Sequence, residues 1–117
     1  MKPITTLDQY YQVITTVPHS IIIFSSLKTC HPCRLLKKWL EEHETYSKEE
    51  HIYDIDVMSA EFDSITNDID CMPTIIYQQY SEEQKRLEGF NKSEITNVLE
   101  LFQSNKKNPV TKPVTIL

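Results

Sequence analysis

The residues with the clearest chemical meaning are Cys30 and Cys33, which are separated by His31 and Pro32 in a C-x-x-C motif. At the start of a helix, this i, i+3 spacing brings both sulfurs to one face, close enough to form a disulfide. The unpaired N–H groups and partial positive charge of a helix N-terminus stabilise a thiolate there. We therefore predict a redox pair in which Cys30, at the outer edge of the turn, is the nucleophile and Cys33 is the resolving thiol.

The two residues inside the motif are predicted to tune the pKa of the nucleophile. Cysteines in such motifs have pKa values of about 3.5–7.5, against about 8.5 for a free thiol. Pro32 has no N–H to lose in a first helical turn and holds φ near the helical value. His31 adds positive charge beside Cys30 when it is protonated.

A metal site is the alternative interpretation of the same motif, because C-x-x-C also forms half of many zinc sites. Cys71 would be the third ligand and His31 the fourth. Adjacent Cys30 and His31 suit tetrahedral coordination of one ion poorly, and the sequence has no second C-x-x-C or H-x₃₋₅-H pair. The redox interpretation is favoured, and we predict no metal. For Cys71 itself, a half-buried small apolar residue is preferred over a regulatory or dimer-forming thiol.

Composition limits the other possibilities. The 117 residues carry a net charge of −5, with 39% apolar and 25% charged residues, which is typical of one soluble globular domain. The acidic balance argues against nucleic acid as a partner, and no apolar run is long enough for a membrane span. Residues 1–6 lack the apolar stretch of a signal peptide, so we expect a cytoplasmic protein. A single glycine excludes Gly-rich phosphate loops, and no cofactor is expected.

Alternating helices and strands must position the motif. A β-branched run at 20–25 predicts a buried strand before it, and Leu35, Leu36, Trp39 and Leu40 form the apolar stripe of a helix after it. The other predicted elements are an edge strand at 2–5, helices at 7–17, 59–68 (capped by Ser59) and 94–102 (capped by Ser93), a strand at 52–57, and strands at 73–80 and 85–90 joined by a turn at 81–84. This predicts an α/β domain over 1–103, followed by an extended or flexible tail over 104–117. His19, His43 and His51, with Glu49 and Glu50, are interpreted as solvated surface.

The sequence resembles the thioredoxin family over residues 5–102. The resemblance rests on a buried strand leading into Cys30-His31-Pro32-Cys33, on Cys71-Met72-Pro73-Thr74 leading into a later strand, and on Gly89 before the last helix. It implies the thioredoxin fold, with three α/β/α layers and a mixed sheet of four or five strands. It also implies that Pro73 is cis and that the backbone of Met72 pairs with an incoming substrate chain.

The resemblance further implies a thiol–disulfide oxidoreductase that takes part in electron transport. Its partners would be a disulfide-containing protein substrate and, as electron donor, a reductase or low-molecular-weight thiol. The alternative is a thioredoxin-fold binding or assembly module with little turnover of its own. The chain departs from the usual family pattern at four positions. It has Phe24 in place of a buried Asp that helps to deprotonate the resolving thiol, Thr29 in place of Trp, His31 in place of Gly, and Lys38 in place of Pro.

Overall fold

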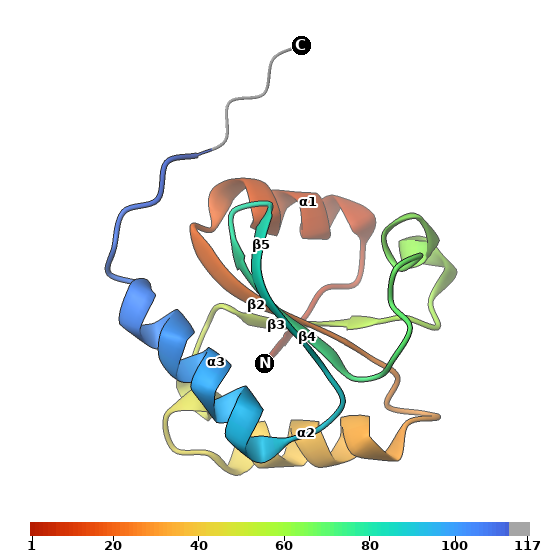
Figure 1. The fold of residues 1–117 in the computed structure, drawn as a ribbon. Coiled ribbons are helices and arrows are strands. Elements are labelled where there is room, and N and C mark those ends of the chain that lie inside the picture. Colours follow the sequence, from red (N-terminus) through yellow and green to blue (C-terminus); the bar gives the residue numbers. More distant parts are fainter. Residues whose placement is uncertain (113–117) are drawn as a thin grey trace.

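A five-stranded mixed sheet forms the centre of the molecule in the computed structural model, which describes residues 1–112 (Figure 1). The strand order is β1-β3-β2-β4-β5, in which β2 runs parallel to β3 and antiparallel to β4. The strands are β1 (Lys2–Pro3), β2 (His19–Ser25), β3 (Ile52–Asp56), β4 (Thr74–Gln79) and β5 (Glu82–Glu88). The central β2 is buried along its whole length, as its continuous β-branched run predicts. The predicted mixed sheet is confirmed.

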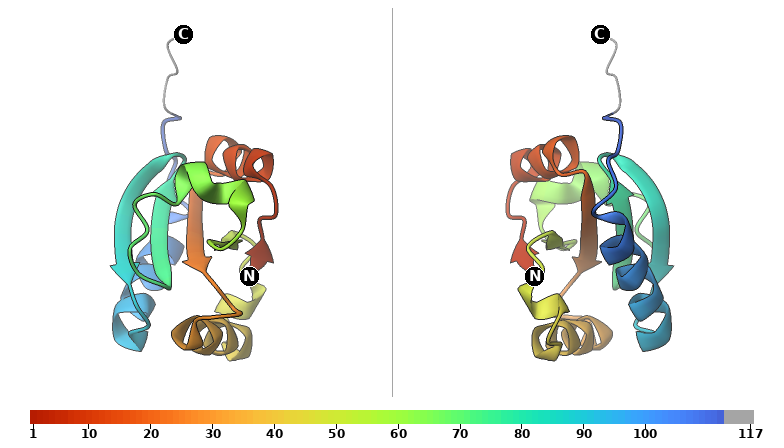
Figure 2. Two further views of the ribbon diagram at one scale, coloured as in Figure 1. Left: turned by 90° about the vertical axis from the view of Figure 1, so that its right-hand side faces the viewer. Right: turned by 90° about the vertical axis from the view of Figure 1, so that its left-hand side faces the viewer.

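Helices cover both faces of the sheet (Figures 1 and 2). They are α1 (Leu7–Thr16), α2 (His31–Glu42) and α3 (Lys92–Asn105), with the short 3₁₀ helices η1 (Tyr46–Lys48) and η2 (Ala60–Ile65). One apolar cluster joins α2 and α3 to the sheet through Ile21, Ile23, Leu36, Leu40, Leu99 and Phe102. The other joins α1 and η2 to the opposite face through Ile22, Phe24, Phe62 and Ile76. The three α/β/α layers follow from this alternation of side chains along β2.

Two predictions about helices and their caps are wrong. Ser93 does not cap α3; Asn91 does, since its side-chain oxygen accepts the Glu94 N–H at 3.1 Å and the Ser93 hydroxyl at 3.0 Å. The predicted helix over 59–68 is only the 3₁₀ helix η2, and the Ser59 side chain makes no capping bond there.

The β4–β5 hairpin turns earlier than predicted. Gln79 pairs with Glu82, so the turn lies at Tyr80 and Ser81 rather than over 81–84, and Tyr80 has a φ of +52°. The charged residues that suggested a long turn belong to β5, which is an edge strand with exposed side chains. Charged residues are common on edge strands because they discourage pairing with other chains.

The segment after α3 contacts the domain. Residues 104 and 105 complete α3, the Lys106 amino group lies 2.6 Å from the Glu49 carboxylate, and the Asn108 carbonyl lies 2.9 Å from His19 Nε2. His19 and Glu49 are therefore buried, and their assignment to the solvated surface is wrong. Residues 113–117 of the predicted tail lie outside the described residues.

The apolar stripe of α2 is narrower than predicted. Leu36 and Leu40 are buried, whereas Leu35 is 41% exposed. Leu35 precedes Leu36 by one residue and so projects about 100° away from it around the helix. No helix within residues 1–112 is long and apolar enough to cross a bilayer.

Candidate active site

The C-x-x-C motif lies where β2 ends and α2 begins. A short loop joins the two elements, and three hydrogen bonds hold it. The Cys30 N–H donates to the Ser26 carbonyl at 3.0 Å, the hydroxyls of Ser26 and Thr29 lie 2.8 Å apart, and the Arg34 guanidinium donates to the Leu27 carbonyl at 2.8 Å. Because β2 is anchored in the middle of the sheet, this loop gives the first cysteine a fixed position.

Cys30 is the N-cap residue of α2, with extended backbone angles. Its sulfur accepts the backbone N–H of Cys33 at 3.2 Å, in the way that a serine or aspartate oxygen normally caps a helix. Cys30 and Cys33 form a disulfide with a Cα–Cα distance of 5.2 Å. The sulfur of Cys30 therefore has both of the environments that the spacing predicts: a bonding partner one turn away and the N-terminus of a twelve-residue helix.

The four residues of the motif differ in exposure. His31 and Pro32 are exposed, Cys30 is 7% exposed and Cys33 is 1% exposed. The order of the two cysteines agrees with an outer nucleophile and a shielded resolving thiol, although Cys30 is also largely covered. Their assigned roles stay predictions, since the exposure of a sulfur does not by itself assign its chemistry.

The loop before β4 forms the other side of the site. The bond between Met72 and Pro73 is cis, and the Met72 carbonyl oxygen lies 3.6 Å from the sulfur of Cys30. Pro73 is buried, and its carbonyl accepts the N–H of Gly89 at 2.8 Å. Gly89 has a φ of +87°, a left-handed conformation that favours glycine. The structure thus brings Cys30, Cys33, Met72 and Pro73 together from segments about forty residues apart.

Cys71 and Phe24 complete the surroundings. Cys71 is exposed, so the preferred interpretation of it as a half-buried apolar residue is wrong. Phe24, in β2, is 3% exposed and lies beside Thr74 of β4 and Ile55 of β3. The position where typical thioredoxins carry an acid is therefore filled here by an apolar ring. Within residues 1–112, no group of three or more His, Cys, Asp or Glu side chains is arranged to hold a metal ion.

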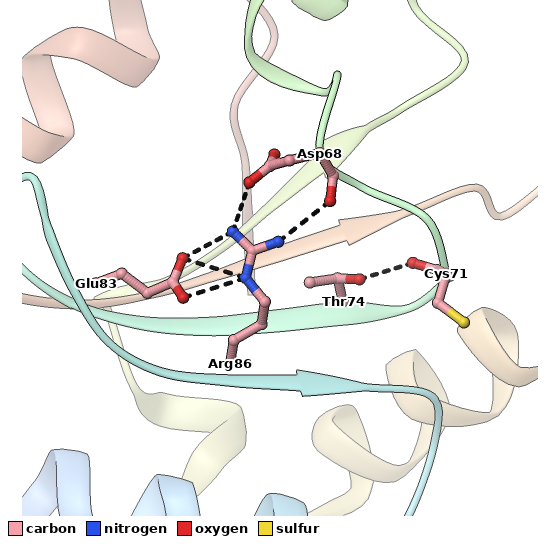
Figure 3. Close-up of polar contacts among 5 residues, drawn as sticks. All are labelled: Asp68, Cys71, Thr74, Glu83 and Arg86. Atoms are coloured by element: carbon pink, nitrogen blue, oxygen red, sulfur yellow. Dashed lines mark hydrogen bonds and ion pairs between the residues drawn. The ribbon is translucent and has the colours of Figure 1, made fainter.

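One polar network beside this loop was missed by the sequence analysis. Arg86 of β5 contacts Asp68 in the loop and Glu83 in its own strand (Figure 3). The two carboxylates raise the pKa of Arg86, so its charge is permanent. The i, i+3 spacing of Glu83 and Arg86 carries no signal in a strand, and Asp68 lies eighteen residues from Arg86. No sequence pattern points to this contact.

Comparison with known proteins agrees with this geometry. The family model for thioredoxin matches residues 2–101. Among solved structures, thioredoxin O1 of Arabidopsis thaliana in its oxidised state is 14% identical with a TM-score of 0.73, covering 86% of this chain and 96% of that one. The oxidised thioredoxin of Plasmodium falciparum is 25% identical with a TM-score of 0.73, covering 87% and 97%. That of Fasciola hepatica is 19% identical with a TM-score of 0.73, covering 87% and 99%. No curated protein sequence matches significantly.

Proposed function

The chain belongs to the thioredoxin family, and on that basis we propose that it is a thiol–disulfide oxidoreductase that exchanges disulfides with protein or small-thiol substrates through Cys30 and Cys33. The observation that carries the proposal is the sulfur of Cys30. It caps α2, accepts the Cys33 N–H at 3.2 Å and is joined to the sulfur of Cys33. A helix N-cap favours the anionic form of such a group, and the thiolate is the reactive form of cysteine.

The reaction begins with the reduced pair. The Cys30 thiolate attacks one sulfur of a substrate disulfide; a bond forms between the two sulfurs, and the substrate S–S bond breaks. The other substrate sulfur leaves as a thiolate and takes up a proton. The exposed His31 and Pro32 flank the point of attack, and their effect is to stabilise the Cys30 thiolate and to fix the first turn of α2.

The resolving step consumes the mixed disulfide. Cys33 loses its proton and attacks the sulfur of Cys30, which releases the second substrate thiolate and leaves the Cys30–Cys33 disulfide. Two electrons pass to the substrate in total. Phe24 offers no proton acceptor, so the proton of Cys33 goes to water or to His31. A reductase or a low-molecular-weight thiol then returns two electrons to the pair, and we propose that this cycle takes place in the cytoplasm.

The substrate chain is proposed to bind along the cis-proline loop. The Met72 carbonyl lies 3.6 Å from the sulfur of Cys30, so a polypeptide that pairs with the Met72 backbone places its disulfide against that sulfur. Such pairing reads main-chain groups rather than particular side chains. It therefore suits an enzyme with several protein substrates.

Insulin reduction with dithiothreitol as electron donor tests the proposal. The wild-type chain should reduce insulin catalytically, and Cys30→Ser should abolish this activity. Cys71→Ser should retain the activity, as a matched cysteine control. Cys33→Ser should accumulate a mixed disulfide, because the resolving thiol is missing. Absence of turnover in the wild-type chain would contradict the proposal. It would favour the binding or assembly module, for which the buried Phe24 in the acid's position is the supporting observation.

A further inference from the structure

The loop over residues 66–73 carries Met72 but has little regular backbone pairing of its own. It lies between η2 and β4, and sheet pairing begins only at Thr74. Near the cysteines, the Thr74 hydroxyl donates to the Cys71 carbonyl at 2.7 Å and the Gly89 N–H donates to the Pro73 carbonyl at 2.8 Å. These bonds fix one end of the loop. Its position also depends on what holds the other end, near Asp68.

Arg86 holds that end from the edge strand. Its Nη2 donates to the Asp68 carboxylate at 2.9 Å, and its Nη1 donates to the Asp68 backbone carbonyl at 3.3 Å (Figure 3). The guanidinium is itself fixed by Glu83, whose oxygens lie 3.2 Å from Nε and whose Oε1 lies 2.7 Å from Nη2. One planar group therefore joins β5 to the loop, and charge-assisted bonds of this kind are about twice as strong as neutral ones.

A pocket of about 300 Å³, partly open to solvent, lies against this network. Arg86 and Asp68 line it together with Phe24 and Gln78. Gln78 is 7% exposed, and within residues 1–112 its Oε1 has no hydrogen-bond partner. Beside Asp68, Ile69 packs against the apolar cluster of this face, whereas the Asp68 side chain is largely exposed. Its contacts to Arg86 are therefore what joins this end of the loop to β5.

We propose that Arg86 is a positioning residue, which fixes the loop carrying Met72 and so sets the affinity of the site for polypeptide disulfides. This inference rests on the proposed function. A polypeptide has to pair with the Met72 backbone and so depends on the position of the loop. A small disulfide without peptide groups needs only the sulfurs of Cys30 and Cys33. Loss of Arg86 should therefore weaken binding of polypeptide disulfides and leave the reduction of small disulfides nearly unchanged.

The test compares Arg86→Gln with Lys85→Gln, which removes one positive charge from the next residue of the same strand. Steady-state kinetics would be measured with insulin and with bis(2-hydroxyethyl) disulfide, using dithiothreitol as donor. For Arg86→Gln we expect KM for insulin to rise about tenfold, with kcat and the small-disulfide rate changed less than about twofold. Lys85→Gln should resemble the wild type with both substrates. Arg86→Lys keeps the charge without the planar fork and should show a smaller rise in KM for insulin.

Amide hydrogen exchange supplies a second measurement. In Arg86→Gln, exchange at Ile69, whose N–H donates to the Thr66 carbonyl at 3.1 Å, should accelerate, while exchange in β2 should not change. Equal losses with both disulfides, or unchanged KM for insulin, would overturn the role of Arg86. If the wild-type chain reduced neither substrate, the proposed function would fail instead, and unchanged exchange at Ile69 would still overturn the positioning of the loop. If Arg86→Gln does not fold, Arg86→Lys carries the same comparison.

Discussion

The two ends of β2 both carry polar side chains, but they hold them in different ways. At the carboxyl end, the sulfur of Cys30 is held by the N–H of Cys33 and by Cys33 itself, three residues away. At the amino end, His19 contacts the Tyr77 hydroxyl and the Asn108 carbonyl, which lie 58 and 89 residues away in the sequence. The contacts at the carboxyl end are therefore local in the sequence, whereas those at the amino end join segments that are far apart along the chain.

At the amino end, the buried side chains of His19 and Glu49 both have polar partners. The Asn108 carbonyl can only accept, so Nε2 of His19 donates to it at 2.9 Å, and Nδ1 lies 2.9 Å from the Tyr77 hydroxyl. Nearby, the buried Glu49 is matched by Lys106 at 2.6 Å. Each of these groups has its partner in the folded chain.

The carboxyl end is held too, but the proposed function requires it to react. In the proposed cycle the bond between Cys30 and Cys33 is broken and formed again, while α2, which Cys30 caps, stays in place. Residues at this end should therefore control chemistry with little effect on the free energy of unfolding. Residues at the amino end should control stability with little effect on chemistry.

The largest effect that tests this difference is expected for His19→Ala. The substitution removes a buried ring and takes one hydrogen-bond partner from the Tyr77 hydroxyl and one from the Asn108 carbonyl; the Tyr77 hydroxyl keeps only the Gln79 amide at 3.3 Å. We expect the free energy of unfolding to fall by about 2–4 kcal/mol. Urea denaturation measures the loss, and the rate of insulin reduction by the folded fraction should be unchanged.

His51→Ala is the matched control for this variant. His51 also bonds a tyrosine hydroxyl, that of Tyr53 at 3.1 Å, and it also lies at the start of a strand, but its ring is only half-buried. The His51→Ala substitution should lower the free energy of unfolding by less than half as much as His19→Ala. Equal losses in the two variants, or a His19→Ala protein with normal stability and impaired reduction, would contradict the division between the two ends.

The same difference explains what the sequence could predict. The C-x-x-C motif, the strand before it and the helix after it form one continuous segment, so local spacing and hydrophobic pattern were enough to place Cys30 and Cys33. The helices and the sheet followed from patterns of the same kind. The cis-proline segment came from a family resemblance.

Most of the contacts that were missed join residues distant in sequence; the cap of α3 by Asn91 and the Glu83–Arg86 pair are local exceptions. His19 and Glu49 were interpreted as surface residues because their partners, at 77, 108 and 106, are far along the chain. The contact of Arg86 with Asp68 is of the same type. Exposure of Cys71 also depends on how the loop before β4 folds against the rest of the domain. Hydrophobic periodicity reports which face of an element is buried, not which polar groups meet there.

A smaller effect, and one confined to the active-site end, is expected for His31→Ala. Positive charge beside Cys30 favours its thiolate and so stabilises the reduced pair. We predict that the wild-type reduction potential lies above about −270 mV, the reference value for thioredoxin itself, and that His31→Ala lowers it by on the order of 20 mV. Equilibration with a glutathione redox buffer measures both potentials.

His43→Ala is the control for this prediction, because His43 lies at the other end of α2, at its C-cap. It should leave the potential unchanged. A wild-type potential below the thioredoxin reference, or equal shifts in the two histidine variants, would contradict the effect of His31. A fall in the free energy of unfolding of more than about 1 kcal/mol in His31→Ala would contradict the separation of chemistry from stability at this end.

The smallest expected effect lies between the two ends of β2, at Asp54 of β3, which neighbours Ile23. Burial raises the pKa of Asp54 above its ordinary value of 3.8, and Lys37 only partly offsets this. The folded state therefore binds the proton more tightly than the unfolded state, so the free energy of unfolding falls as pH rises through the raised pKa. Asp54→Asn should be more stable than the wild type at pH 7 by a few tenths of a kcal/mol, whereas substitution of the exposed Asp63 should have no such effect. Because the advantage comes from removing a charge, it should disappear in urea denaturation below pH 3.8; an advantage that persisted there would mean that packing, not charge, limits stability at this position.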